Sequence, residues 1–182
     1  MKDTLRASYD RSANTYDRDF ADLQAVKYEA MLGQNREMLD PIVRAGGRFL
    51  DVGCGTGLLA GWLIVRGVCI RDLIGIDLSL GMARMARSRL RIAVHGDKDR
   101  LPFAARSFDA VLAFTALHIW EASEAAALGE IRRVIRPGGL FVVTVLARRF
   151  SESIERGIIE AGFTVHDRRP CGQDVGLLAL AP

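Results

Sequence analysis

The chain has 182 residues, 49% hydrophobic and 26% charged, with a net charge of +3 and a pI near 9.0. These values are typical of a globular protein with a core of its own and argue against a disordered or fibrous chain. No apolar run reaches the roughly 18 residues that a membrane span needs, and the N-terminus lacks the apolar segment of a signal peptide. Its three cysteines lack CxxC spacing. We therefore expect a cytoplasmic protein without disulfides, bound metal or membrane contact.

The first 45 residues differ from the rest because they are polar, helical in pattern and without a strand-like run. We expect residues 1–182 to form a single domain in which residues 1–45 are a helical cap or lid and residues 46–182 an α/β core. One helix would place Tyr9 and Tyr16, seven residues apart, on the same face. Their rings either close over a ligand or pack the helix onto the body.

From residue 46 onward, apolar runs that end near Gly or Asp alternate with stretches of helical periodicity. This alternation is typical of βαβ units and a parallel sheet covered on both faces. The sequence predicts an α/β protein with a doubly wound, seven-stranded sheet, mostly parallel with an antiparallel C-terminal strand, and helices on both faces. The expected strands are 48–52, 72–77, 91–97, 109–114, 140–147, 163–168 and 175–181, and the expected helices are 57–67, 79–90, 123–135 and 151–161. Pro137-Gly138-Gly139 is expected to close the third helix, and a Pro-Cys-Gly turn to join the last two strands.

A glycine-rich loop, DVGCGTG at 51–57, follows the first predicted strand. Glycines let the backbone approach a ligand and take positive φ, and the following helix offers unpaired N–H groups. A dinucleotide loop would need a glycine where Leu58 stands, and the Lys of a P-loop is missing. Asp51 at the strand end would repel a pyrophosphate and favour a ligand that carries a cation or amine. The simpler alternative is that the glycines only allow a tight connection between the strand and the helix, without binding a ligand.

Two more acids follow the next predicted strands. Asp77 ends the second strand, where a carboxylate can accept hydrogen bonds from both ribose hydroxyls of an adenosine. Asp97 follows the third strand and could accept one from an adenine amino group. Because the carboxyl ends of parallel strands meet at one edge of a sheet, we expect Asp51, Asp77 and Asp97 to face the same crevice.

Together these segments resemble a class I S-adenosylmethionine-dependent methyltransferase of the small-molecule type. The resemblance covers most of the chain and is carried by YDRSANTYD at 9–17, FLDVGCGTG at 49–57, GIDLSLGM at 75–82, GDKDRLPFAARSFDAVLAFTALHIW at 96–120 and EIRRVIRPGGLFVVT at 130–144. It implies a Rossmann-like fold. It also implies S-adenosylmethionine as cofactor, S-adenosylhomocysteine as product, and in-line methyl transfer to a small-molecule acceptor.

The resemblance also implies roles for single residues. Asp51 and the backbone at Gly53 and Gly55 would hold the methionine part of the cofactor, and Asp77 would hold the ribose. The remaining implied contacts are Leu78, Met82, Asp97 and the Lys98 backbone at the adenine, Phe114 near the sulfonium, and Tyr16 and Tyr9 closing over the cofactor.

The sequence determines neither the identity of the methyl acceptor nor the oligomeric state. Nothing is inserted between the fifth strand and the helix at Ser151, so the acceptor pocket is expected to use the N-terminal helices and the loop after Phe114. His118 in that loop is the candidate general base, if one is needed, and otherwise orients the loop. The alternatives are a protein or RNA methyltransferase, although charge alone makes nucleic acid an unfavoured partner, and a non-catalytic S-adenosylmethionine-binding protein. The glycine spacing argues against a NAD-dependent dehydrogenase.

Overall fold

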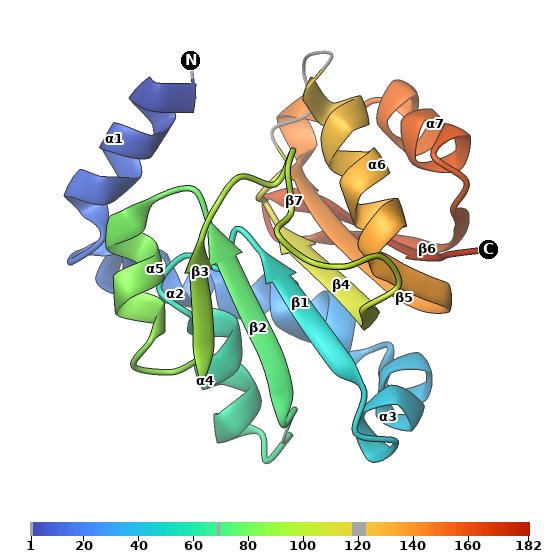
Figure 1. The fold of residues 1–182 in the computed structure, drawn as a ribbon, viewed down its shortest axis with the longest axis horizontal. Coiled ribbons are helices and arrows are strands. Elements are labelled where there is room, and N and C mark those ends of the chain that lie inside the picture. Colours follow the sequence, from blue (N-terminus) through green and yellow to red (C-terminus); the bar gives the residue numbers. More distant parts are fainter. Residues whose placement is uncertain (1, 69, 118–122) are drawn as a thin grey trace.

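The computed structural model describes residues 2–68, 70–117 and 123–182, and they form one seven-stranded sheet (Figure 1). The strand order is β3-β2-β1-β4-β5-β7-β6. Strands β1 to β5 pair in parallel, and β7 runs antiparallel to both β5 and β6. The predicted fold class is therefore confirmed. The strands are β1 (Arg48–Val52), β2 (Asp72–Asp77), β3 (Ile92–His95), β4 (Phe108–Phe114), β5 (Ile135–Leu146), β6 (Thr164–Cys171) and β7 (Asp174–Leu180).

Helices cover both faces of this sheet, with α6 and α7 on one face and α2 and α4 on the other (Figure 1). Two apolar clusters fill the spaces between the layers, one containing Ile131 of α6 and Ile158 of α7, the other Met31 and Leu59. No described helix is both long and apolar enough to span a membrane. The helices are α1 (Lys2–Ser12), α2 (Tyr16–Tyr28), the π-helix η1 (Glu29–Gly33), α3 (Arg36–Arg44), α4 (Leu58–Val65), α5 (Leu80–Ala86), α6 (Ser123–Val134), the 3-10 helix η2 (Ala147–Arg149) and α7 (Glu152–Glu160).

Two local predictions are wrong. Pro137, Gly138 and Gly139 do not close a helix, because β5 begins at Ile135, directly after α6. Ile135 pairs with Phe108, and the three residues form an irregularity before the regular pairing with β4 resumes. The other error is the predicted turn in the C-terminal hairpin, since β6 continues to Cys171 and includes Pro170. An edge strand tolerates proline because one side of its backbone needs no partner.

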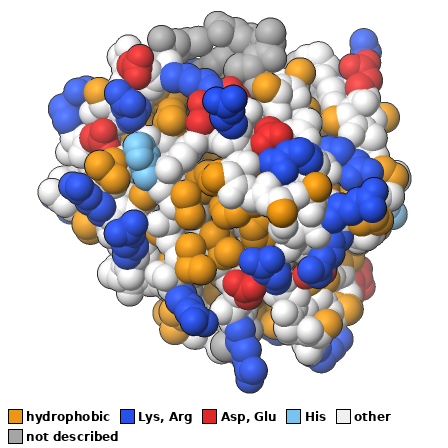
Figure 2. Space-filling model, in the orientation of Figure 1, with side chains coloured by type: hydrophobic (Ala, Val, Ile, Leu, Met, Phe, Trp, Pro, Cys, Tyr) orange, Lys and Arg blue, Asp and Glu red, His pale blue; other side chains and the backbone are white. Residues whose placement is uncertain are grey.

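The connection from β3 to β4, residues 96–107, contains no helix. It passes in front of the sheet, and its Leu101 and Phe103 pack against the core cluster of that face (Figure 1). Figure 2 shows apolar side chains in the middle of this face, over β1 and β2, with Lys and Arg side chains around them. Asp97 lies at the start of this connection, beside the ends of β2 and β3.

The N-terminal helices are packed firmly onto the C-terminal hairpin. A Cβ atom added at Gly176 in β7 would clash with Sδ of Met31, a fully buried residue of η1. A Cβ atom added at Gly129 in α6 would contact nothing. The space between η1 and β7 is therefore filled completely.

We expect Gly176→Ala to lower the free energy of unfolding by about 1–3 kcal/mol, because the added methyl group overpacks the contact with Met31. Gly129→Ala is the control, and it should leave stability unchanged or raise it by up to about 1 kcal/mol, since alanine favours helix. Urea unfolding measures both. Equal midpoints for wild type and Gly176→Ala would contradict the tight packing of η1 on β7.

Candidate functional site

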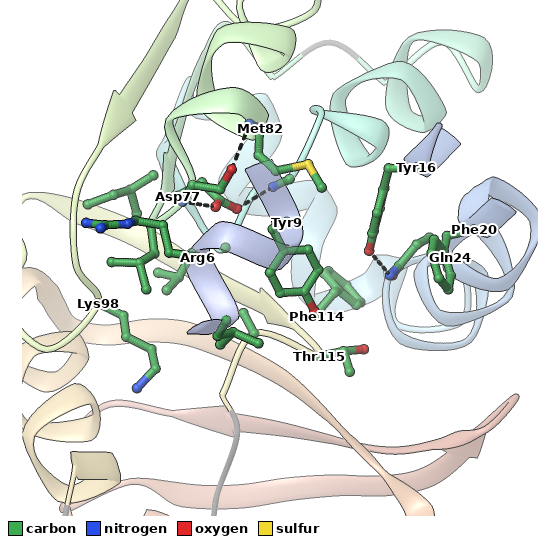
Figure 3. Close-up of a pocket in the computed structure, with 18 of the residues that line it drawn as sticks. Arg6, Tyr9, Tyr16, Phe20, Gln24, Asp77, Met82, Lys98, Phe114 and Thr115 are labelled. Atoms are coloured by element: carbon green, nitrogen blue, oxygen red, sulfur yellow. Dashed lines mark hydrogen bonds between the residues drawn. The ribbon is translucent and has the colours of Figure 1, made fainter. Parts of the chain in front are cut away.

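A cavity of about 550 Å³ lies at the carboxyl ends of the strands, where the strand order reverses between β1 and β4. Open α/β sheets bind their ligands at this place, and the volume is in the range of small-molecule sites. Figure 3 shows Asp77 and Met82 on one side of the cavity, Phe20 and Gln24 on the other, and Tyr9 and Phe114 between them. The lining comes from α1, α2, the glycine loop, the ends of β2, β4 and β5, and the β6–β7 turn.

The glycine loop is shaped by its own backbone and by Asp77. Gly53 has φ +71°, and a Cβ atom there would clash with Ala116, so only glycine fits. Its N–H donates to the Ile76 carbonyl at 2.8 Å. Gly57 takes a left-handed conformation (φ +83°) as the N-cap of α4. The glycines therefore let the chain turn sharply from β1 into α4 while leaving the backbone open to the cavity.

Asp77 at the end of β2 holds the glycine loop. Its carboxylate accepts hydrogen bonds from the backbone N–H groups of Gly55 and Ser79, each at 2.8 Å. Burial raises the pKa of Asp77, and the two amide donors oppose that shift. Each carboxylate oxygen can still accept a further bond, so Asp77 can both shape the loop and receive hydroxyl groups.

Asp51 lies deeper than Asp77, with 4% of its surface exposed, and lines a second cavity of about 20 Å³ beside the large one. Burial, and to a lesser extent the charge of Asp77, raise the pKa of Asp51 to about 7. Gln24 lines both cavities and is 7% exposed. Its Nε2 donates to the Tyr16 hydroxyl at 3.2 Å, whereas its Oε1 is buried without a hydrogen-bond partner. Two hydrogen-bond acceptors thus face a polar space large enough for one water or ammonium group.

The adenine-side residues predicted from sequence also line the large cavity. Asp97 accepts a hydrogen bond from Lys2 Nζ of α1 at 2.7 Å, and its other oxygen accepts one from the Asp99 N–H at 3.0 Å. Leu78 and Lys98 lie next to it on the lining, and Met82 is almost fully buried in the wall. Lys2 therefore attaches the start of α1 to this end of the site.

The two Tyr-Asp pairs of the N-terminal segment attach it to the ligand-facing loops. Asp10 accepts hydrogen bonds from Ser79 Oγ at 2.6 Å and from the Gly81 N–H at 2.9 Å. Asp17 accepts a hydrogen bond from the Thr56 hydroxyl, and its other oxygen lies 2.7 Å from Arg89. The two tyrosines line the cavity.

Tyr9 and Tyr16 do not share a helix, because the chain turns at residues 13–15 between α1 and α2. The prediction of one continuous helix face was therefore wrong. The turn brings the rings together in a different way, with their centroids 6.3 Å apart in an edge-to-face arrangement.

The end of the cavity beyond Phe114 is formed by a buried polar network. Lys27 of α2 donates to Thr115 Oγ1 at 2.6 Å and lies 3.3 Å from Asp174 Oδ1. Thr115 Oγ1 in turn donates to Asp174 Oδ2 at 2.6 Å. Thr115 has φ +53°, a conformation unusual for a β-branched residue, and its N–H donates to Thr144 Oγ1. This network joins α2 to β5, to β7 and to the residue that follows β4.

The structure brings together every described residue that the sequence proposed for the site. Asp51 lines the small cavity, His118 lies outside the described residues, and the others line the large cavity, namely Tyr16, Gly53, Gly55, Asp77, Leu78, Met82, Asp97, Lys98 and Phe114. Sequence reasoning missed Lys2, Gln24 and Lys27, because polar residues on a helix give no signal of the cavity that they face. It also missed the contribution of η2 and the β6–β7 turn to the lining.

The comparisons with known proteins agree with this geometry. Residues 50–143, just over half of the chain, match a family described as a methyltransferase domain, and the chain belongs to that family. It is 38% identical over 156 residues to a malonyl-[acyl-carrier protein] O-methyltransferase of Methylovorus sp., covering 80% of this chain and 50% of the relative. It is 30% identical to an uncharacterized protein of Methanocaldococcus jannaschii, covering 87% of this chain and 58% of the relative. The chain thus spans about half the length of these curated relatives.

Solved structures show the same fold. A chain in the complex of the Haloferax volcanii Trm112 methyltransferase activator with a methyltransferase aligns with a TM-score of 0.70 at 18% identity, covering 96% of this chain and 97% of that one. An S-adenosylmethionine-dependent methyltransferase of Thermotoga maritima aligns with a TM-score of 0.67 at 20% identity, covering 96% and 98%. The fold is therefore the Rossmann-like fold of class I methyltransferases. The [4+2]-cyclase SpnF shares it with a TM-score of 0.64 at 22% identity, covering 75% of this chain and 76% of that one, so the fold by itself does not fix the reaction.

The raised pKa of Asp51 predicts a pH-dependent stability. Its carboxyl stays protonated in the folded state up to about pH 7 but ionises near pH 4 when unfolded. Between these values the folded state binds more protons, so the free energy of unfolding should fall as pH rises. Asp51→Asn removes this titration and keeps the volume. The stability gained by the variant relative to wild type should therefore be greater at pH 8 than at pH 5, by a few kcal/mol at most.

Urea unfolding of both proteins at pH 5 and pH 8 measures this difference. An effect of Asp51→Asn that is the same at both pH values would mean that Asp51 titrates normally.

Proposed function

We propose that this protein is an S-adenosylmethionine-dependent methyltransferase that acts on a small-molecule acceptor. The observation that carries the proposal is the convergence of three carboxylates, Asp51, Asp77 and Asp97, on one cavity pair at the switch point of the sheet. A ligand with a ribose, an adenine and an amine matches these acceptors. The family membership supports the same conclusion.

The residues present fit S-adenosylmethionine in their donor and acceptor chemistry. Asp77 would accept from the ribose hydroxyls, and Asp97 with the Lys98 backbone would contact the adenine edge between Leu78 and Met82. Asp51 and the unpartnered Oε1 of Gln24 would accept from the amino group of the methionine part, in the small cavity that they share. This assignment gives a partner to a buried oxygen that otherwise has none.

The backbone of the glycine loop and the aromatic side chains would complete the cofactor site. Gly53 and Gly55 leave the backbone open to the methionine part, and Phe114, 7% exposed, would lie beside the sulfonium. Tyr16, whose pKa burial raises to about 12, stays a neutral hydroxyl and ring over this part of the cavity. Cations bind favourably to aromatic faces, so such a lining suits a sulfonium.

When bound, S-adenosylmethionine supplies a methyl group made electrophilic by the adjacent sulfonium. The task of this chain is to orient an acceptor and exclude water, and orientation can lower a barrier by several kcal/mol. The N-terminal helices serve both purposes, since α1 and α2 cover the cavity and are anchored by Asp10, Asp17 and Lys27. The described part of the lining contains no histidine, so His118 is retained only as a proposal for a base when the acceptor is protonated.

Calorimetric titration with S-adenosylhomocysteine tests the cofactor site. Wild type should bind it, and Asp77→Asn should bind at least tenfold more weakly, because an amide accepts fewer hydrogen bonds than a carboxylate and lacks its charge. Asp72→Asn is the matched control, because Asp72 lies at the opposite end of the same strand and pairs with Arg48. The affinity of Asp72→Asn for S-adenosylhomocysteine should equal that of wild type. No binding to wild type would overturn the proposal, and binding without methyl transfer to any acceptor would favour a non-catalytic protein.

A second titration tests the assignment of Gln24. Gln24→Leu should weaken the binding of S-adenosylhomocysteine about tenfold, because the amino group of the ligand loses an acceptor in a buried space. The same variant should bind 5′-methylthioadenosine, which lacks the amino acid part, as well as wild type does. Equal losses for the two ligands would mean that Gln24 acts only by supporting the pocket.

A further inference from the structure

Charged side chains line both ends of the large cavity, but its two carboxylates lie at one end only. Asp77 and Asp97 line the end where the proposed cofactor would lie, together with Lys2, Arg6 and Lys98, and Asp51 lines the small cavity beside it. The other end, past Phe114, is lined by Lys27, Arg148 and Arg149. Among the described residues no carboxylate lines this second end, since Asp174 lies behind Lys27 and is 1% exposed.

Lys27 is held in place as a cation at the floor of this basic end. Its ammonium donates to Thr115 and lies beside Asp174, and only 6% of the residue is exposed. An ammonium group has three N–H donors, and these contacts engage at most two of them. Because Lys27 also lines the cavity, a remaining donor can serve a bound group.

Arg148 of η2 also lines the cavity. Leu146 of β5 pairs with Asp174 of β7, and η2 begins at the next residue. The arginines of η2 therefore follow closely after the residue that pairs with Asp174, the ion-pair partner of Lys27. The Ala147 N–H donates to the Gln173 carbonyl at 2.9 Å and fixes this corner. Arg148 is exposed and forms no ion pair with any described residue, which leaves its guanidinium available to a ligand.

Apolar side chains also line the cavity. They include Phe20 and Leu23 of α2, each 40% exposed, and Leu146 at the end of β5. Large apolar side chains with this exposure are expected where a ligand with an apolar body covers them. The cavity thus combines apolar side chains with a buried ammonium and an accessible guanidinium.

We infer that the methyl acceptor is an anionic small molecule with an apolar body, whose negative group is held by Lys27 and Arg148. This inference rests on the proposed function, because it assigns the acceptor's part of the same cavity. A guanidinium and an ammonium together bind carboxylates and phosphates through charge-assisted hydrogen bonds. A cationic acceptor would meet like charge at this end, and a neutral one would leave the guanidinium of Arg148 without a counter-charge.

Calorimetry on protein saturated with S-adenosylhomocysteine tests the inference with simple probes. Hexanoate should bind at least tenfold more tightly than hexanamide, its neutral analogue. Hexyl phosphate distinguishes the two sources of anion: tighter binding than hexanoate assigns the site to phosphates, and weaker binding assigns it to carboxylates. Equal affinity for hexanoate and hexanamide would overturn the inference.

Variants locate the binding to this end of the cavity. Arg148→Gln should weaken the binding of hexanoate about tenfold and leave the affinity for S-adenosylhomocysteine unchanged. Arg156→Gln is the charge-matched control, since Arg156 is exposed on α7 away from the cavity, and it should change neither affinity. Lys27→Met can fail to fold because it leaves Asp174 buried and unpaired, so Lys27→Met with Asp174→Asn is the companion variant.

The outcomes separate the two proposals. If S-adenosylhomocysteine does not bind to wild type, the proposed function fails and the assignment of an acceptor fails with it. If it binds but Arg148→Gln leaves hexanoate affinity unchanged, the anionic acceptor alone is overturned.

Discussion

The reversal of strand order between β1 and β4 is the constraint on which the rest of the structure depends. It leaves a crevice at the carboxyl ends of the strands that neither adjacent crossover fills. The glycine loop turns at that point, and Asp77 of the neighbouring strand fixes it through the Gly55 and Ser79 amides. The same geometry buries Asp51 close to Asp77, and this raises its pKa. The shape of the glycine loop, the raised pKa of Asp51 and the position of the cavity therefore all follow from the reversal of strand order.

The N-terminal helices complete the site rather than merely covering it. They supply Gln24 and Lys27 to the cavity lining and are held at several points along its length. Lys2 and Asp10 attach α1 to Asp97 and to Gly81, Asp17 attaches the start of α2 to the glycine loop, and Lys27 attaches the end of α2 to β7. Most of these anchors contact the loops that line the cavity.

Among the described lining residues, the carboxylates lie where β1 and β2 end and where the connection from β3 to β4 begins. Lys27, Arg148 and Arg149 line the other end, near the end of β5 and the start of η2. Phe114 separates them, and its ring packs edge to face on Tyr28 of α2 with the centroids 4.8 Å apart. A methyl donor with hydroxyls and an amine and an acceptor with a negative group would each meet complementary chemistry.

The sequence by itself determined the α/β class, the strands and the carboxylates at their ends, because periodicity and strand-end position are local features. It placed Asp51, Asp77 and Asp97 correctly at the crevice, since parallel strands must end at the same edge. Only the tertiary structure decided that α1 and α2 are separate helices, that β5 begins at Ile135, and that Gln24, Lys27 and Arg148 face the cavity. These features depend on contacts between segments far apart in the chain, such as Lys27 with Asp174, and no local pattern encodes which face of a polar helix will meet a pocket.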